Sequence, residues 1–238
     1  MGVRPRLVLV HGTRFDSAEW AGYAERLPQC EVVTVDLPGH GSRVGESFDL
    51  TGALRVIDEA VTAPAPEGEQ PVVLAGHSLG GYLSAEYARR HPERLAGLGI
   101  IGAAADPSRH RHLTHLYSGF AALLPVVGAD RMARFANSVM GRAGVASGVM
   151  PGPEGYAVTA DAWSTVIATS GTHQLRELTC PVLVISGQWD QLRIDAARYA
   201  AASPGGWVVT VPRATHLFPL THPEALATAL AELVRRST

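Results

Sequence analysis

The chain has 238 residues, of which 46% are hydrophobic and 18% are charged. This mixture can bury a large core and argues against a disordered chain. The formal net charge is −2, so no overall positive field would attract nucleic acid or an anionic membrane surface. All 20 basic residues are arginine, which excludes lysine-based chemistry and suggests a bacterial genome rich in G and C.

The sequence carries no signal for export or for a membrane span. The N-terminal apolar run around Val8 is too short for a secretory signal, and no stretch reaches the roughly 18 apolar residues that a spanning helix needs. Cys30 and Cys180 lie far apart and fit no metal-ligand spacing, so we expect two buried free thiols. These features predict a soluble, cytoplasmic protein, and they leave its oligomeric state open.

Six short apolar runs predict buried β-strands at residues 7–10, 31–35, 72–75, 98–102, 182–186 and 207–211. The runs are continuous rather than alternating, which is typical of a sheet covered on both faces. Helical patterns lie between or after them at residues 50–61, 82–90 and 223–235. The alternation predicts an α/β fold with a mostly parallel sheet and helices on both of its faces.

The alternation of strands and helices breaks between residues 106 and 173. This stretch has helical segments, no clear strand and a loop-like part rich in glycine and proline around residues 141–155. We therefore expect a core made of residues 1–105 and 174–238, with residues 106–173 inserted as a small helical cap.

One serine stands where a sharp turn is expected. Gly76-His77-Ser78-Leu79-Gly80 follows the predicted strand at 72–75 and precedes a predicted helix. A serine at a tight strand-to-helix turn needs small residues two positions to either side, and the two glycines meet that need. The helix that follows would point its N-terminal N–H groups at the site, where negative charge develops during attack on a carbonyl. The pattern predicts that Ser78 is a nucleophile.

Other motifs lie before and after this serine, and the chain order of the three polar residues concerned is Ser, Asp, His. His11-Gly12 follows the first predicted strand, and Asp190 and His216 follow the last two. With these motifs, the sequence resembles the α/β-hydrolase family over nearly its whole length. The resemblance implies that Asp190 is the acid and His216 the base of a catalytic triad.

The resemblance also implies an oxyanion hole made by the backbone N–H groups of Thr13 and Leu79. It implies no metal and no organic cofactor, and a small-molecule, ester-like substrate as partner. Residues that could line the substrate pocket are Arg14, His77, Tyr117, Phe120, Leu124, Phe135, Trp189 and Leu217. The apolar members in the cap could equally pack the cap onto the core.

Several assignments have competitors. Asp195 is the alternative acid, and His222, just before a proline, is the alternative base. His110, His112 and His115 invite a metal interpretation, but no cysteine or carboxylate nearby completes a ligand set, so we expect a solvated helix face.

Arg14 has two interpretations. Its guanidinium could meet a carboxylate of the substrate, or it could point to solvent or pair with Asp16 or Glu19.

The predicted function is hydrolysis of a carboxylic ester, thioester or lactone through an acyl-enzyme on Ser78. The same triad could serve a carbon–carbon bond hydrolase or a lyase. Related folds also include cofactor-free dioxygenases and non-catalytic ligand-binding proteins. The sequence does not indicate which of these compounds is the substrate.

Overall fold

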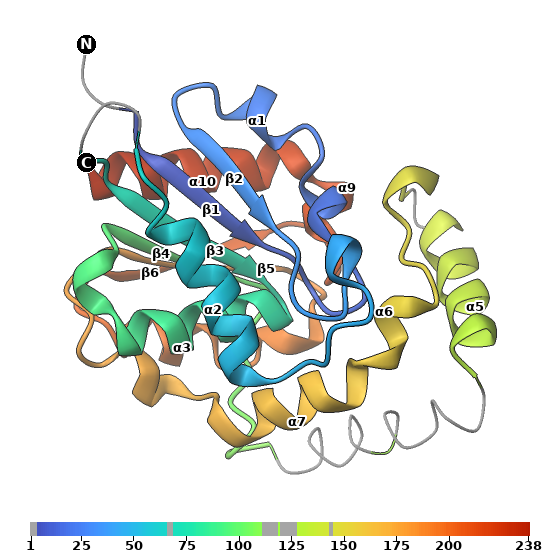
Figure 1. The fold of residues 1–238 in the computed structure, drawn as a ribbon. Helices are drawn as coiled ribbons and strands as arrows, with labels where there is room; N and C mark the ends of the chain where they lie inside the picture. Colours follow the sequence, from blue (N-terminus) through green and yellow to red (C-terminus); the bar gives the residue numbers. More distant parts are fainter. Residues whose placement is uncertain (1–3, 66–68, 111–118, 120–127, 143–144) are drawn as a thin grey trace.

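The computed structural model describes residues 4–65, 69–110, 119, 128–142 and 145–238. They form a six-stranded sheet in the order β2-β1-β3-β4-β5-β6 (Figure 1). Every pair of neighbouring strands is parallel. The strands are β1 (Arg6–Val10), β2 (Glu31–Val35), β3 (Val72–His77), β4 (Gly97–Ile101), β5 (Val182–Gly187) and β6 (Gly206–Val211). The predicted fold class and the six predicted strands are therefore confirmed, but the prediction that all six are buried is wrong for β2 and β6, which lie at the edges of the sheet and are only partly buried.

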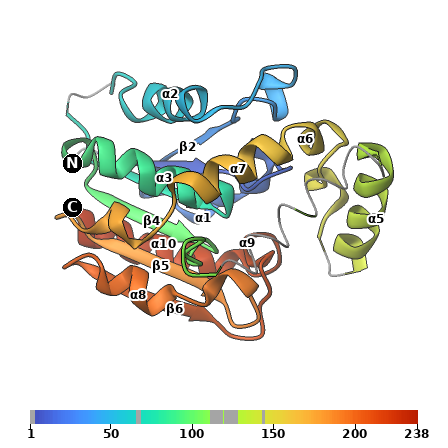
Figure 2. The same ribbon diagram turned by 90° about the horizontal axis from the view of Figure 1, so that it is seen from below.

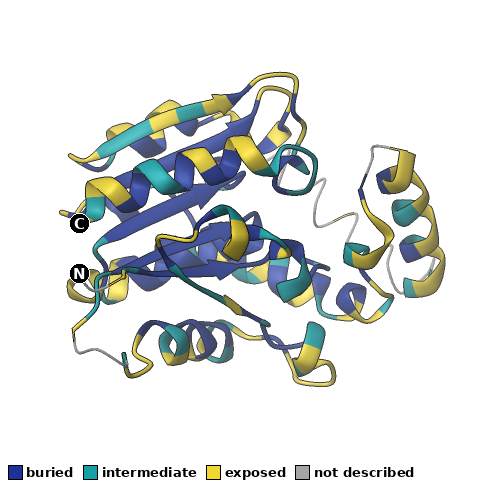
Figure 3. Cartoon of the chain, turned by 90° about the horizontal axis from the view of Figure 1, so that it is seen from above, coloured by how far each residue is buried: buried dark blue, intermediate teal, exposed yellow. Residues whose placement is uncertain are grey.

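The central strands are buried on both faces, which explains their continuous apolar sequence. In β1, Val8 and Val10 pack into the core on one side of the sheet, whereas Leu7 and Leu9 pack into the core on the other side. All four side chains are fully buried, as alternating strand residues must be when helices cover both faces (Figure 3).

Helices cover each face of the sheet. On one face lie α2 (Leu50–Val61), α3 (Leu79–Arg90) and α8 (Ala196–Ala201). On the other lie α1 (Tyr23–Arg26), α9 (Phe218–Thr221) and the long α10 (Pro223–Ser237) (Figures 1 and 2). Short 3-10 helices lie in the connections between these elements: η1 (Ser17–Trp20), η2 (Gly41–Arg43), η3 (Pro92–Arg94), η4 (Ser147–Val149), η5 (Thr172–Leu175) and η6 (Gln191–Arg193).

One predicted helix differs at its start. The sequence pattern places it at residues 82–90, but α3 begins at Leu79, directly after Ser78. Gly80 and Gly81 have low helix propensity and hide the first turn from a pattern-based prediction. The earlier start brings the helix N-terminus up against the serine.

The connection between β4 and β5 carries α5 (Ala129–Arg142), α6 (Glu154–Ala157) and α7 (Thr159–Thr169). Helix α7 packs on the core through Ala162 and Val166. Helix α5 lies apart from the sheet, with an outer surface that is largely exposed (Figures 2 and 3). The division into a core and a cap over residues 106–173 stays a prediction.

Cys30 and Cys180 are buried free thiols, as predicted, and burial raises the pKa of both. Among the described residues, no helix combines the length and the apolar character needed to cross a bilayer.

Candidate active site

Because all strands run in the same direction, the loops after their carboxyl ends meet at one edge of the sheet. Ser78 follows β3 at this edge, with a φ of 51° and a ψ of −115°. A positive φ is strained for a residue with a Cβ, and such strain is typical of functional sites. The Ser78 N–H donates to the carbonyl of Ile101 at 2.8 Å, which helps to hold the turn in place.

The two glycines that flank the serine lie against backbone. A Cβ on Gly76 would lie 2.2 Å from the carbonyl oxygen of Gly80, and a Cβ on Gly80 would lie 2.4 Å from the carbonyl oxygen of Val10. Both distances are far below contact, and backbone cannot move aside as a side chain can. The turn that presents Ser78 therefore requires glycine at these two positions.

Asp190 and His216 lie in the loops after β5 and β6 and are hydrogen-bonded to each other. The His216 Nδ1 lies 3.0 Å from each carboxylate oxygen of Asp190. The Asp190 side chain is fully buried, and its Oδ1 also accepts the N–H of Leu192 at 2.8 Å. Burial alone would raise the pKa of Asp190, but the hydrogen bonds from His216 and from the Leu192 N–H lower it below the ordinary value. The carboxylate is therefore ionised and orients the imidazole.

Ser78 and His216 line the same small cavity, of about 80 Å³. Within the described residues, the His216 ring hydrogen-bonds through Nδ1 alone. Its Nε2 is therefore not engaged with the Ser78 hydroxyl in this structure. Such hydrogen bonds are often long without substrate and shorten when it binds.

Two backbone donors lie beside the serine. Leu79 is the first residue of α3, so its N–H has no acceptor within the helix. Thr13 lies in the loop after β1 and lines the cavity. Both N–H groups are free of a backbone acceptor in the described chain.

A buried ion pair, not foreseen from the sequence, connects the loops of the site. The Nδ1 of His77 lies 2.5 Å from Oε1 of Glu19, and each side chain is at most 1% exposed. The other oxygen of Glu19 accepts the N–H of Gly12 at 2.7 Å. The Nε2 of His77 lies 3.1 Å from the carbonyl oxygen of His216. Glu19 therefore links the loop after β1 to the turn at Ser78 and, through His77, to the loop that carries His216.

In this pair, each group shifts the pKa of the other in the direction that favours the charged form. Burial alone would lower the pKa of His77, but the Glu19 carboxylate raises it above its ordinary value. Burial alone would raise the pKa of Glu19, and His77 lowers it instead. The pair is therefore ionised in the folded protein.

Two further histidines hold the loop after β1. His11 Nε2 accepts the N–H of Leu37 at 3.0 Å, and His40 Nε2 accepts the N–H of Arg14 at 3.3 Å. Burial lowers the pKa of both rings, that of His40 to about 4. A neutral ring keeps a nitrogen free to accept, so His40 fixes the backbone of Arg14, whose φ is 72°.

Of the predicted pocket residues, the structure brings Arg14, His77 and Leu217 to the cavity. It does not bring Phe135 or Trp189 there, because their side chains are 69% and 62% exposed, on α5 and in the loop after β5. Tyr117, Phe120 and Leu124 lie outside the described residues.

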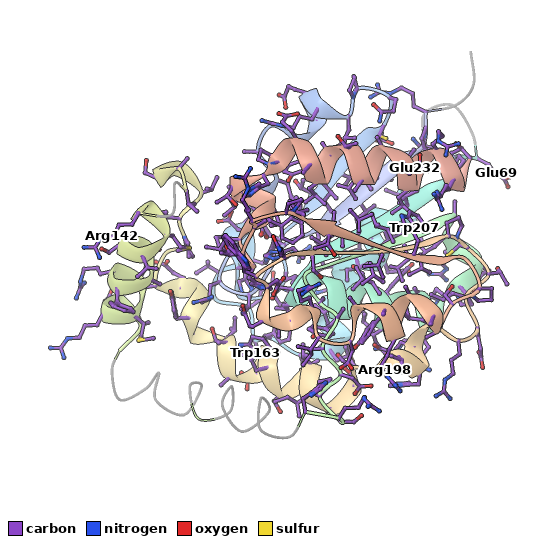
Figure 4. The ribbon with its side chains drawn as sticks, turned by 180° about the vertical axis from the view of Figure 1, so that it is seen from behind. Glu69, Arg142, Trp163, Arg198, Trp207 and Glu232 are labelled. Atoms are coloured by element: carbon purple, nitrogen blue, oxygen red, sulfur yellow. The ribbon has the colours of Figure 1, made fainter. Side chains whose placement is uncertain are left out.

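Four lining residues were not foreseen: Phe15, Trp163, Gln191 and Leu192. Phe15 and the pair Gln191-Leu192 adjoin predicted loop residues, and that adjacency could have indicated them. Trp163 lies on α7 (Figure 4), and no local pattern distinguishes it from a packing residue.

The competing acid and base are occupied elsewhere. Asp195 Oδ2 accepts the N–H of Asp106 at 2.9 Å and lies 2.7 Å from Nε2 of His110. His222 precedes α10, and its Nδ1 lies 2.9 Å from the Thr221 hydroxyl.

The histidines considered as metal ligands are only partly described. His112 and His115 lie outside the described residues, whereas His110 contacts Asp195. In the part of the chain that the structure describes, no three His, Cys, Asp or Glu side chains gather as a metal site would require.

Comparison with known proteins identifies the family of the chain. A model of the alpha/beta hydrolase family matches residues 7–229, so the chain belongs to that family. Over 250 residues, the chain is 30% identical to the pimeloyl-(acyl-carrier protein) methyl ester esterase of Edwardsiella ictaluri, covering 95% of this chain and 92% of that protein.

Solved structures share the architecture. A thermophilic esterase from Thermogutta terrifontis, solved with malate bound, has a TM-score of 0.72 and 25% identity, covering 100% of this chain and 92% of that chain. MenH from S. aureus has a TM-score of 0.79 and 17% identity, covering 100% of this chain and 96% of that chain. The likeness to MenH is evidence for the fold alone.

Proposed function

We propose that this protein is an enzyme that hydrolyses a carboxylic ester through an acyl-enzyme on Ser78. The observation that carries the proposal is the shared cavity: a serine in a strained turn lines it together with His216, which is hydrogen-bonded to the ionised Asp190. The esterases of E. ictaluri and T. terrifontis support an ester as substrate.

A serine hydroxyl is a weak nucleophile until a base removes its proton. His216 Nε2 accepts the proton from Ser78 as Oγ attacks the ester carbonyl, and Asp190 holds the ring in the tautomer that leaves Nε2 free. The carbonyl oxygen becomes negatively charged beside the N–H groups of Thr13 and Leu79. Each such donor lowers the barrier by about 3 to 4 kcal/mol.

Collapse of this intermediate expels the alcohol, which takes its proton from His216, and leaves the acyl group on Ser78. Water then attacks the acyl-enzyme, with His216 again as base. The water supplies the hydroxyl of the new acid, and its second proton returns to Oγ. The step needs no co-reactant besides water. We propose that the substrate is a small molecule and that the protein acts in the cytoplasm.

Labelling by a fluorophosphonate probe tests the nucleophile. The wild type should be labelled, and Ser78→Ala should lose the label. Ser147→Ala, which changes an exposed serine, should keep it. A wild type that stays unlabelled would refute the proposal.

A panel of p-nitrophenyl esters of increasing acyl length, run beside thioesters and lactones, then tests the substrate class. Turnover that depends on Ser78 is expected, with an optimum that reports the size of the pocket. A flat and feeble response to all of them would favour a carbon–carbon bond hydrolase, or, if oxygen is consumed, a dioxygenase.

A further inference from the structure

Arg14 is a cationic residue among those that line the cavity shared by Ser78 and His216. Its Cζ lies 5.3 Å from the ring centre of Tyr156, a residue of α6, and its Nη1 lies 3.5 Å from the Tyr156 hydroxyl. A Cβ added to Gly155 would lie only 2.5 Å from the carbonyl oxygen of Arg14, so the backbone of Arg14 also packs closely against α6. The residue is therefore held in place between the loop after β1 and the β4–β5 connection.

The acids closest to this arginine in the chain are engaged elsewhere. The Asp16 carboxylate accepts the N–H of Ala18 at 2.8 Å, and both oxygens of Glu19 are taken by Gly12 and His77. Among the described residues, no carboxylate lies within ion-pair distance of the Arg14 guanidinium. The interpretation that Arg14 pairs with Asp16 or Glu19 therefore does not hold.

The donors next to the cavity are also unsatisfied. The Nε of Arg14 is buried and has no hydrogen-bond partner within the described chain. The same is true of the hydroxyl of Thr13, a residue that is 6% exposed and lines the cavity. Buried polar groups are almost always hydrogen-bonded, and an unpaired one costs free energy. Both residues line the cavity, but these two atoms are themselves covered in this structure, so a ligand group that satisfies them must first displace the atoms that cover them.

The chemistry of these groups selects the ligand. A guanidinium presents a planar fork of N–H donors that matches the two oxygens of a carboxylate, and a hydroxyl can donate to the same group. Phe15, Leu192 and Leu217 supply apolar surface in the same cavity, which suits a short hydrocarbon linker.

We propose that Arg14 and Thr13 form a carboxylate subsite, so that the preferred substrate is an ester whose acyl part ends in a second, free carboxylate. This inference rests on the proposed function, because Ser78 must attack the ester at the other end of the same acyl chain. The product of hydrolysis is then a dicarboxylate.

A matched pair of esters tests the subsite. Monomethyl glutarate and methyl pentanoate have the same chain and leaving group and differ only in a terminal carboxylate or methyl. Proton release in a pH-stat gives kcat and KM for each. We expect the wild type to prefer monomethyl glutarate by tenfold or more in kcat/KM. Monomethyl succinate and monomethyl adipate then report the spacing from Ser78 to Arg14.

Three variants test whether the preference depends on the positive charge of Arg14. Arg14→Gln should lower the preference for monomethyl glutarate at least tenfold, chiefly through KM, because a charge-assisted hydrogen bond is lost. Arg14→Lys should retain part of the preference, since it keeps the charge and loses the fork. Arg193→Gln removes the same charge from exposed η6 and should keep the full preference.

Binding gives a readout that does not depend on turnover. Calorimetry on Ser78→Ala, which leaves the esters intact, should show that monomethyl glutarate binds more tightly than methyl pentanoate, and Arg14→Gln in that background should weaken the binding of monomethyl glutarate at least tenfold. Equal use of both esters by an enzyme that the fluorophosphonate labels would overturn the subsite and leave the proposed function standing. Absence of labelling would overturn the proposed function, and binding of monomethyl glutarate that does not depend on Arg14 would overturn the subsite by itself.

Discussion

Substitution of Glu19 by Gln tests the buried ion pair. The carboxylate receives two hydrogen bonds, from His77 at 2.5 Å and from the N–H of Gly12 at 2.7 Å, with almost no exposure to solvent. Breaking a buried pair by removing one partner costs about 3 to 5 kcal/mol. The amide of glutamine can still accept from Gly12, so we expect the lower end, a loss of about 3 kcal/mol in the free energy of unfolding.

The loss should depend on pH. His77 has a folded-state pKa above its ordinary value of 6.5, so its contribution is fully present below that pH and fades as pH rises through the raised pKa. Glu19 has a folded-state pKa below its ordinary value of 4.5, so its contribution is present above that pH and fades as pH falls through the lowered pKa. The difference between wild type and Glu19→Gln should therefore be larger at pH 6 than at pH 9.

Urea unfolding at the two pH values measures this difference. Glu93→Gln is the control, because Glu93 forms only exposed ion pairs and should cost less than about 1 kcal/mol. Activity gives a second readout: Gly12 precedes the proposed donor Thr13, so the variant should lose about tenfold to a hundredfold in kcat. A Glu19→Gln protein as stable as Glu93→Gln at pH 6, or a difference independent of pH, would refute the reasoning.

Three further outcomes are expected. Gly102→Ala would put a Cβ, at a φ of 57°, 3.0 Å from Asp190 Oδ2 and 3.3 Å from the His216 ring, so kcat should fall at least tenfold, whereas Gly148→Ala, with open space around it, should not change kcat. Asp190→Asn should lower kcat about 10⁴-fold with unchanged far-ultraviolet dichroism, and a loss below tenfold would exclude Asp190 as the orienting acid. The pKa of His40 is lowered to about 4 in the folded protein, so His40 destabilises the fold as pH falls below 6.5. Between pH 7 and 4.5 the unfolding free energy of the wild type should therefore fall by about 2 to 3 kcal/mol more than that of His40→Gln. Parallel curves for the two proteins would contradict this.

The sheet could be predicted from the sequence because its signal is local. A strand covered on both faces needs a nearly unbroken apolar run, and the central strands β1, β3, β4 and β5 show one. The turn at Ser78 is equally local, since Gly76 and Gly80 stand two residues to either side of it. Gly76 is required by the backbone of Gly80, four residues away, whereas Gly80 is required by the carbonyl of Val10 on the neighbouring strand, a contact that the local pattern does not reveal.

The remaining features depend on contacts between distant parts of the chain. Glu19 and His77 are 58 residues apart, and nothing near either one indicates that they pair. Trp163 reaches the cavity because α7 packs back onto the core. Trp189 adjoins Asp190 in sequence, yet its side chain turns to solvent, because neighbours along a loop need not face the same way. Periodicity and motif spacing carry no information about such placements.

The proposed nucleophile, base, acid and oxyanion donors all come from loops after β1, β3, β5 and β6, and none comes from the connection between β4 and β5. That connection supplies instead Trp163 at the cavity and the face of α6 against Arg14. Mutations can therefore accumulate in α5, α6 and α7 and change which acyl chain is admitted without disturbing the atoms that attack it. Only part of substrate recognition is separable in this way, because Arg14 and Phe15 follow the proposed donor Thr13 in the loop after β1 and stay with the reacting groups.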